Sequence, residues 1–181
     1  MHLLKHVCFA GILGWLATTA GCGLLPPVCQ DLSVQGICTF RSPDFMDQVV
    51  TLNTDAQLQL ANPYRHFYVV MRHNEYSDLK ARYPKYSLED YYDFHIENLL
   101  QDFAEPQAPG PAERQLQGLE ALIGTFTGNY KGDLVYGRLV LLRSKVRLYQ
   151  FAMWCPVADT AYCRPYMDTI IQTFREIPRE R

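Results

Sequence analysis

The sequence predicts an α+β domain in which an antiparallel sheet is packed by helices. Extended apolar runs separated by short polar turns indicate strands in the middle and the C-terminal half of the chain. Two other segments repeat apolar residues at spacings of three and four, which is typical of amphipathic helices. The strands come in groups rather than in strict alternation with helices. This grouping favours an α+β fold over a parallel α/β fold.

Residues 1–21 have the layout of a lipoprotein signal peptide. One lysine precedes an apolar run over residues 7–20, which is shorter than the roughly 20 residues that a membrane-spanning helix needs. Ala20-Gly21 then precede Cys22. This order resembles the bacterial lipobox, whose cysteine carries the lipid, although Thr19 stands where that pattern usually has an aliphatic residue. Ordinary signal peptidase cleavage after Ala20 is the alternative.

The cysteine count favours lipidation of Cys22. Cys8 leaves with the signal peptide under either alternative, so lipidation of Cys22 leaves an even set for pairing in an oxidising compartment. The set is Cys29, Cys38, Cys155 and Cys163. The simplest pairing closes two local loops, from Cys29 to Cys38 and from Cys155 to Cys163. The two other connectivities remain open.

The chain length predicts one folded unit. We expect residues 22–28 to be the lipidated cysteine and a short tether, residues 29–178 a single α+β domain and residues 179–181 a tail. The 17 Lys and Arg residues against 19 Asp and Glu residues give a net charge of −2. This balance shows no basic footprint for a nucleic acid.

The first half of the domain predicts three strands and a helix. We expect strands at Phe45–Asn53, Ala56–Asn62 and Arg65–His73, the first two joined like a hairpin. Ser87 can cap a helix, and Asp90 completes a capping box. The apolar residues of this helix share one face, which should pack on the sheet. They are Leu88, Tyr92, Ile96, Leu99 and Phe103.

The second half predicts a loop, a meander and a last helix. Three prolines make residues 104–113 a loop. Short turns then join three antiparallel strands at Gln115–Tyr130, Leu134–Arg143 and Val146–Trp154. The segment Arg164–Ile177 is amphipathic and should close the domain as a helix.

The C-terminal half resembles PsbP-type domains over residues 115–177. The similarity consists of a glycine-interrupted strand, a meander ending LYQFAMWCP and a helix ending in an I-x-x-[ST]-F signature, filled by Ile170, Thr173 and Phe174. The resemblance implies an α-β-α sandwich and a non-enzymatic accessory or binding role in an exported or membrane-attached protein. It carries no catalytic residues to this chain.

A tyrosine-rich segment is the strongest candidate for a contact surface with another protein. Tyrosine and arginine are enriched in protein interfaces, and an acidic stripe on the following helix adds a docking face. The alternatives are that the tyrosines border the core and that the carboxylates lie on a solvated helix face. The candidate residues are Tyr76, Arg82, Tyr83, Tyr86, Tyr91, Asp90, Asp93 and Glu97.

These observations favour a membrane-anchored bacterial lipoprotein that acts as a non-enzymatic binding or assembly accessory of the cell envelope. Its expected partners are the membrane, through Cys22, and an envelope protein; no motif indicates a cofactor or a metal. It would face the periplasm or the cell exterior. Gly23 after the cysteine resembles the outer-membrane sorting pattern of two-membrane bacteria. The alternatives are an envelope hydrolase using His73 and Glu75, and a small-ligand carrier with a large apolar cleft.

Overall fold

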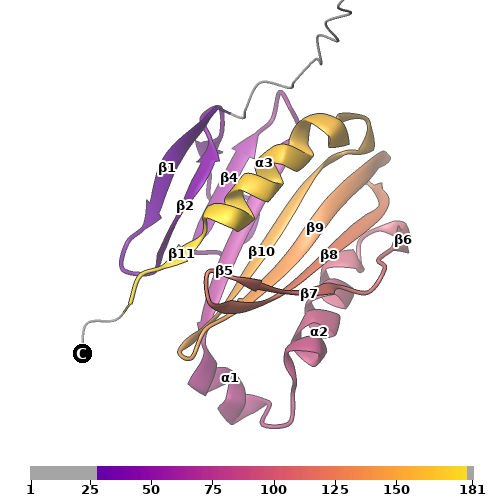
Figure 1. Cartoon of the computed structure of the whole chain (residues 1–181). Helices are drawn as coiled ribbons and strands as arrows, with labels where there is room; N and C mark the ends of the chain where they lie inside the picture. The colour runs from indigo at the N-terminus through magenta and orange to yellow at the C-terminus, as the bar shows by residue number, and fades with distance from the viewer. Residues whose placement is uncertain (1–27, 179–181) are drawn as a thin grey trace, which may run out of the picture.

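A large antiparallel sheet with helices on both faces forms the centre of the molecule (Figure 1). The computed structural model describes residues 28–178. The strand order in the large sheet is β3-β4-β5-β10-β9-β8-β6, and β7 also pairs with β8. A smaller sheet has the order β1-β2-β11. The predicted α+β class, an antiparallel sheet packed by helices, is confirmed.

The bounds of the elements follow the chain in order. The first half contains β1 (Cys29–Val34), β2 (Cys38–Pro43), β3 (Asp47–Gln48), β4 (Leu58–Asn62), β5 (Phe67–Glu75), α1 (Tyr76–Arg82) and α2 (Leu88–Leu100). The second half contains β6 (Ala104–Gln107), β7 (Ala112–Leu116), β8 (Leu119–Tyr130), β9 (Asp133–Arg143), β10 (Arg147–Pro156), a 3-10 turn (Val157–Asp159), α3 (Thr160–Thr173) and β11 (Arg175–Glu176).

The predicted meander is present as β8, β9 and β10, which pair as antiparallel neighbours. Its first strand is shorter than the predicted Gln115–Tyr130. Gln117 and Gly118 have φ of 55° and 80°, and Leu116 pairs with Leu119 across them. Two consecutive positive φ angles make the tight hairpin turn that a Gln-Gly pair permits. The chain therefore reverses at this point, and β7 is a separate strand.

The predicted loop over residues 104–113 is wrong in part, because it contains β6 and the start of β7. Both strands pair with the outer side of β8, and β6 is interrupted by a register shift. Pro106 lies in β6. Proline is tolerated on an edge strand because its missing N–H would face solvent. The prolines of this segment are therefore compatible with a strand at the edge of the sheet, and they do not exclude it from the sheet.

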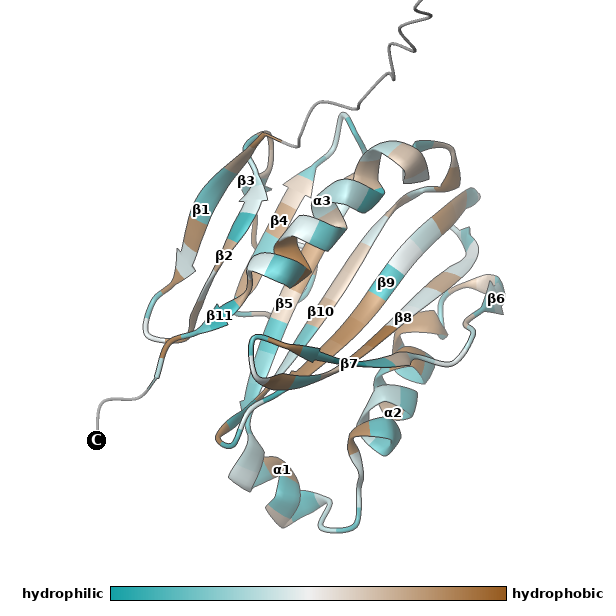
Figure 2. Ribbon diagram, viewed as in Figure 1, coloured by the Kyte–Doolittle hydropathy of each residue, from teal (hydrophilic) through white to brown (hydrophobic). Residues whose placement is uncertain are grey.

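α3 and α2 cover opposite faces of the large sheet. α3 buries Met167 and Ile170 against Phe151 and other residues of one face, whereas α2 buries Tyr92 and Ile96 against the other face. The ribbons between the helices are largely apolar, and the outer edge strand β7 is hydrophilic (Figure 2). Successive side chains along each strand point to opposite faces of the sheet, so apolar strands contribute to two cores, one on each side.

The C-terminal signature closes the α3 side of the fold. Ile170 and Phe174 are buried, and the Oγ1 atom of Thr173 accepts a hydrogen bond of 2.9 Å from the Arg41 backbone N–H on β2. The predicted helix Arg164–Ile177 is wrong at its end. The helix stops at Thr173, and Arg175–Glu176 pair with Thr39 and Cys38 as β11. The open edge of β2 captures these residues because it offers unpaired backbone groups.

α1 was not predicted, and three strands of the first half have other bounds than expected. β3 is only two residues long, β4 begins at Leu58, and β5 extends to Glu75. α2 begins after Ser87, as predicted, with both hydrogen bonds of the capping box present. No helix within residues 28–178 has the length and apolarity to cross a membrane.

Candidate binding groove

A groove lies on the face of the large sheet opposite α3. α2 packs over Leu122, Phe126, Leu139 and Leu141 of β8 and β9, so it covers only half of this face. The other half, over β10 and β5, borders a cavity of about 310 Å³. A second cavity of about 400 Å³ shares Leu52, Tyr130 and Trp154 with the first. The two cavities form one groove that passes Trp154, which we call the sheet groove.

Regular geometry positions the polar side chains of the sheet groove. Gln150 and Trp154 lie on one face of β10, because side chains two apart on a strand share a face. Register places Arg72 of β5 directly opposite Gln150. On the other wall, His95 and Asn98 lie three residues apart on α2, and Asp102 follows one helical turn later. Polar groups thus face each other across the groove.

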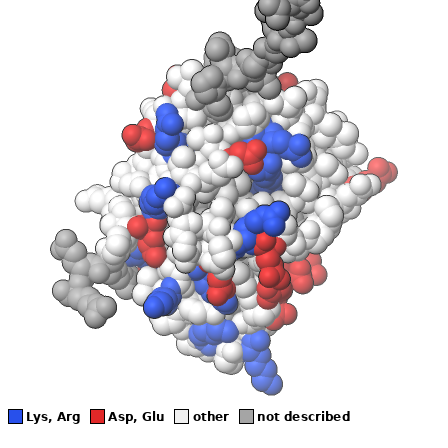
Figure 3. All heavy atoms as spheres, viewed as in Figure 1, with Lys and Arg blue, Asp and Glu red and all other residues white. Residues whose placement is uncertain are grey.

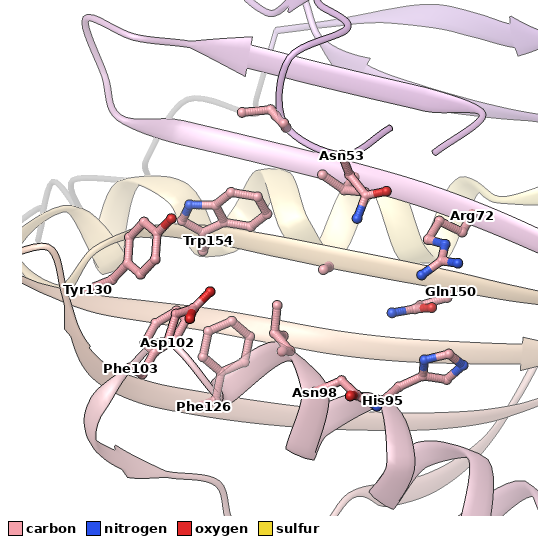
Figure 4. Close-up of a pocket in the computed structure, with 14 residues that line it drawn as sticks. Asn53, Arg72, His95, Asn98, Asp102, Phe103, Phe126, Tyr130, Gln150 and Trp154 are labelled. Atoms are coloured by element: carbon pink, nitrogen blue, oxygen red, sulfur yellow. The ribbon is translucent and has the colours of Figure 1, made fainter. Parts of the chain in front are cut away.

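One end of the sheet groove is polar. Arg72, Gln150 and His95 point toward one another there (Figure 4). The Arg72 Nη2 atom lies 3.7 Å from Asp55 Oδ2, a partly exposed ion pair that contributes little to stability. The Oε1 atom of Gln150 is buried and has no hydrogen-bond partner among the described residues. A buried acceptor without a donor is unfavourable, so this end of the groove is suited to a ligand that donates a hydrogen bond.

His95 is neutral at pH 7. Burial lowers its pKa to about 4, and the nearby positive charge of Arg72 lowers the pKa in the same direction. The ring is therefore available as one donor and one acceptor rather than as a cation.

The other end of the sheet groove is aromatic. The rings of Trp154 and Tyr68 stack with centroids 5.4 Å apart and an interplanar angle of 21°. Tyr130 lies at the same end of the groove as Trp154 (Figure 4), and the centroid of its ring is 5.1 Å from that of the Phe103 ring. Asp102 points into the space between these rings (Figure 4). This end offers apolar ring surface with one carboxylate beside it.

The buried side chain of Gln59 fixes the loop that contains Leu52 and Asn53 and borders the sheet groove. Gln59 Oε1 accepts hydrogen bonds from the backbone N–H groups of Leu52 and Asn53, at 2.6 and 2.9 Å, and Gln59 Nε2 donates to Asn53 O at 2.6 Å. Asn53 Oδ1 accepts from the Asp55 N–H. The amide nitrogen of Asn53 is left directed into the groove (Figure 4).

The predicted tyrosine surface is only partly exposed. Tyr83 and Tyr86 stack at 5.0 Å between centroids, and Tyr91 packs against Tyr86 at 5.4 Å. Tyr91 is only 2% exposed and belongs to the core of α2, so its assignment to an interface is wrong. Tyr76 is half-buried and accepts a hydrogen bond from Arg143. Arg82 and Tyr83 are exposed beside this cluster.

The predicted acidic stripe is exposed on α2. Asp93 and Glu97 are solvent-exposed. Asp90 Oδ2 accepts the Ser87 backbone N–H at 2.7 Å, and this hydrogen bond lowers the pKa of the Asp90 carboxyl. Asp90 therefore caps the helix, and Asp93 and Glu97 remain the candidates for docking.

No disulfide joins the four cysteines within residues 28–178 of this structure. Cys29 pairs with Pro43 and Cys38 with Val34, so five residues separate the two cysteines along the hairpin, about 16 Å. The predicted bridge between Cys29 and Cys38 is therefore wrong. Cys155 and Cys163 are hydrogen-bonded neighbours, and that contact together with burial raises the pKa of the Cys155 thiol. Their bridge stays a prediction, and the lipidation site Cys22 lies outside the described residues.

His73 and Glu75, the candidate pair for a hydrolase, lie inside β5 on the α3 side. The His73 ring is 6.1 Å from the ring of Tyr149, and Arg147 Nε is 3.6 Å from Glu75 Oε1. Arg147 is buried and also donates to the carbonyl of Ile177. Both residues thus belong to the packing that closes the C-terminus, on the opposite face from the sheet groove. This placement gives no support to the alternative of a hydrolase that uses His73 and Glu75.

Sequence reasoning missed Arg72, His95, Gln150 and Trp154 as groove residues. One signal was present for Gln150, which is a polar residue inside the otherwise apolar run LYQFAMW, whereas Arg72 begins the polar end RHNE of its strand. Such breaks in an apolar run indicate polar positions on a strand face. Nothing in the sequence shows that α2 leaves this part of the face uncovered. In residues 28–178, no group of three or more His, Cys, Asp or Glu side chains is placed to hold a metal ion.

Solved structures share the fold. CyanoP, the cyanobacterial PsbP of Synechocystis sp. PCC 6803, has a TM-score of 0.59 and 14% identity, and the match covers 90% of this chain and 99% of CyanoP. LpqN of Mycobacterium tuberculosis, described as involved in cell envelope biogenesis, has a TM-score of 0.53 and 14% identity over 78% of this chain and 83% of LpqN. No protein-family profile and no curated sequence matches. These likenesses show that the chain has a PsbP-like fold.

Proposed function

We propose that this PsbP-like chain is a membrane-anchored lipoprotein that acts as a non-enzymatic binding accessory of the cell envelope, with the sheet groove as its ligand site. The sheet groove is the observation that carries the proposal. α2 covers half of the face, and the other half presents polar side chains, among them Gln150, whose buried Oε1 atom has no partner among the described residues. Clefts with a few convergent polar groups are the usual form of ligand sites. The envelope role of LpqN and the lipobox around Cys22 support the location.

Anchoring is tested by changing Cys22→Ser in the full chain. The variant should move from the membrane fraction to the soluble fraction, because two or three acyl chains hold a protein to a bilayer and none remains. Cys38→Ser is the matched control and should stay in the membrane. Complete membrane retention of the Cys22 variant would contradict the anchor.

Ligand capture in cells tests the site itself. A photoreactive amino acid at Asn98, which is exposed at the groove rim, should cross-link one recurrent species. The same amino acid at Glu113, exposed on the edge strand β7, is the control position. A ligand site in the sheet groove requires capture from Asn98 and none from Glu113. Equal capture or no capture at the two positions would contradict it.

Protein docking through the tyrosine cluster is a second candidate function. Tyr83 is 39% exposed and stacks on Tyr86, with Arg82 beside it. Exposed, mutually supported tyrosines with arginine are typical of interface anchors. Capture of a single envelope protein from Tyr83, with none from Asn98, would favour this function over a groove ligand.

A further inference from the structure

The chemistry of the sheet groove selects a class of ligand. The polar lining of its first cavity includes three side-chain amides, one carboxylate and one guanidinium: Asn53, Asn98, Gln150, Asp102 and Arg72. The second cavity adds one ammonium group and one carboxylate, those of Lys131 and Asp133. Amides both donate and accept hydrogen bonds, whereas a carboxylate only accepts and a guanidinium only donates. Such a mixed lining suits a ligand whose groups donate and accept at many points. Hydroxyl groups have this property.

The charges of the groove disfavour two other classes. An acyl chain would leave the buried Oε1 atom of Gln150 without a partner, at a cost of about 1–3 kcal/mol. A ligand with several negative charges would meet the Asp102 carboxylate within the groove. On the opposite, α3 face of the molecule, basic and acidic side chains are interleaved over most of the surface, and acidic side chains gather at the lower right of the view (Figure 3). Within the groove itself, the basic side chains of Arg72 and Lys131 are matched by the carboxylates of Asp102 and Asp133, so a neutral ligand is favoured there.

Trp154 supplies the apolar part of the recognition. The indole borders both cavities, and Tyr68 stacks on it at 5.4 Å, which fixes its orientation. A pyranose ring presents C–H groups on its faces and hydroxyls at its edge. Such a ring can place a face on the indole and direct its hydroxyls toward the surrounding amides, as rings with an apolar body and polar rim do.

Gln150 favours a ligand that donates a hydrogen bond at this position. Its Oε1 atom is buried and has no partner among the described residues, beside Arg72 and His95, which point toward it. A hydroxyl of the ligand would donate to this oxygen. The two cavities, of about 310 and 400 Å³, meet at Trp154 and Tyr130. Each lies within the range of small-molecule sites, about 300–1,000 Å³, so the groove has room for more than one ring.

We propose that the sheet groove binds a neutral di- or trisaccharide, with one ring stacked on Trp154 and a hydroxyl of a second ring donating to Gln150. This inference rests on the proposed function of the groove as a ligand site and names the class of the ligand.

Calorimetric titration of the full-length anchored protein in phospholipid nanodiscs tests the inference. The probes are N,N′-diacetylchitobiose and cellobiose, with the open-chain polyol mannitol as the negative probe. At least one disaccharide should bind saturably and quench the fluorescence of Trp154. Gln150→Leu should weaken this binding about tenfold, because a buried hydrogen bond is lost. Gln107→Leu, the same change at an exposed position of β6, should leave the affinity unchanged.

The outcomes separate the ligand class from the site. Saturable binding that Gln150→Leu weakens, with its thermal unfolding unchanged, supports a saccharide. Absence of binding by both disaccharides, or binding that Gln150→Leu leaves intact, overturns the saccharide. If Asn98 still captures a ligand in cells in that case, the sheet groove remains a site for another class. If Asn98 captures nothing, the proposed function fails with it.

Discussion

Single buried side chains decide how this protein responds to oxidation and to acid. Cys155 at the end of β10 and Cys163 in the first turns of α3 are both fully buried and in contact, whereas Cys38 lies among Arg147 and Glu176. Burial raises the pKa of the Cys38 thiol to about 12, so this cysteine is an unreactive core residue at neutral pH. The cysteines are thus chemically unlike one another, although the sequence shows them as two similar local pairs.

In the exported protein we expect Cys155 and Cys163 to form a disulfide and Cys38 to stay a thiol. Closing a loop of this length should add about 2.5 kcal/mol to the free energy of unfolding, by the chain-entropy estimate. Alkylation of the denatured, unreduced protein followed by mass spectrometry should label Cys38 and leave Cys155 unlabelled. Cys163→Ser should make Cys155 reactive to alkylation. Labelling of Cys155 in the unaltered exported protein would contradict the prediction.

His95 should make the protein less stable in mild acid. Burial lowers its pKa from 6.5 to about 4, so only the unfolded chain binds this proton between those values. Above pH 6.5 the protonation of His95 does not lower the free energy of unfolding. Between pH 6.5 and about 4, proton binding to the unfolded chain lowers this free energy by on the order of 3 kcal/mol. Urea unfolding at a series of pH values should show this fall. His95→Gln should reduce the slope between pH 6.5 and 4; an unchanged slope would show that other groups cause it.

At the scale of elements, Gly124 sets how closely α2 approaches the sheet, and Gly137 lets Phe126 of β8 pack against β9. A β-carbon on Gly124 of β8 would lie 1.8 Å from the hydroxyl of Tyr92, and one on Gly137 of β9 would lie 2.1 Å from the ring of Phe126. These glycines let two buried aromatic rings lie directly on the backbone of the sheet. The close approach of α2 also positions His95 and Asn98 at the groove.

Gly124→Ala should lower the free energy of unfolding by about 1–3 kcal/mol, because Tyr92 and α2 have to move outward. Chemical denaturation measures the change. Gly110 lies in a loop with open space around the added β-carbon, so Gly110→Ala is the matched control and should be nearly neutral. Equal stability of the two variants would mean that α2 adjusts at no cost. Moving α2 should also weaken any ligand held between α2 and β10.

At the scale of the whole molecule, the chain enters the domain at one end and presents the tyrosine cluster at the other. The start of β1 and the turn between β4 and β5 lie at the same end, and α1 lies at the opposite end (Figure 1). Two hydrogen bonds connect the start of β1 with the end of β4 through residues 44 and 45. The Asp44 N–H donates to Val28 O, and Asn62 Nδ2 donates to Phe45 O. Residues 23–28 reach at most about 20 Å when extended. An anchor at Cys22 would therefore hold this end near the lipid.

In the anchored protein we expect Tyr64, which is 95% exposed in the turn between β4 and β5, to lie at the membrane surface. Tyrosine is enriched at that depth of a bilayer. A fluorescent amino acid at position 64 should be quenched by lipids that carry a quencher on the headgroup. The same amino acid in place of Tyr83, 39% exposed at the other end, should not be quenched. Equal quenching at both positions would rule out this orientation.

Local patterns were enough for much of this fold. Ser87 and Asp90 placed the start of α2, the short turns before β9 and β10 placed the meander, and Ile170 and Phe174 placed the buried face of α3. Each of these signals acts over a few residues. β7, β11 and the Cys29–Val34 strand depend instead on an unpaired strand edge elsewhere in the chain, and their own sequences carry little signal.

The sequence by itself determined the α+β class, the start of α2 and the meander β8-β9-β10, and it predicted the anchor at Cys22. Only the tertiary structure decided where α2 rests across the sheet, which thiols meet, and that Arg72, His95, Gln150 and Trp154 share one groove. The physical reason is the distance along the chain over which each interaction acts. Capping, periodicity and turn chemistry act between neighbours in the chain, whereas a groove is the part of a sheet face that a helix leaves uncovered, and that depends on the packing of the whole molecule.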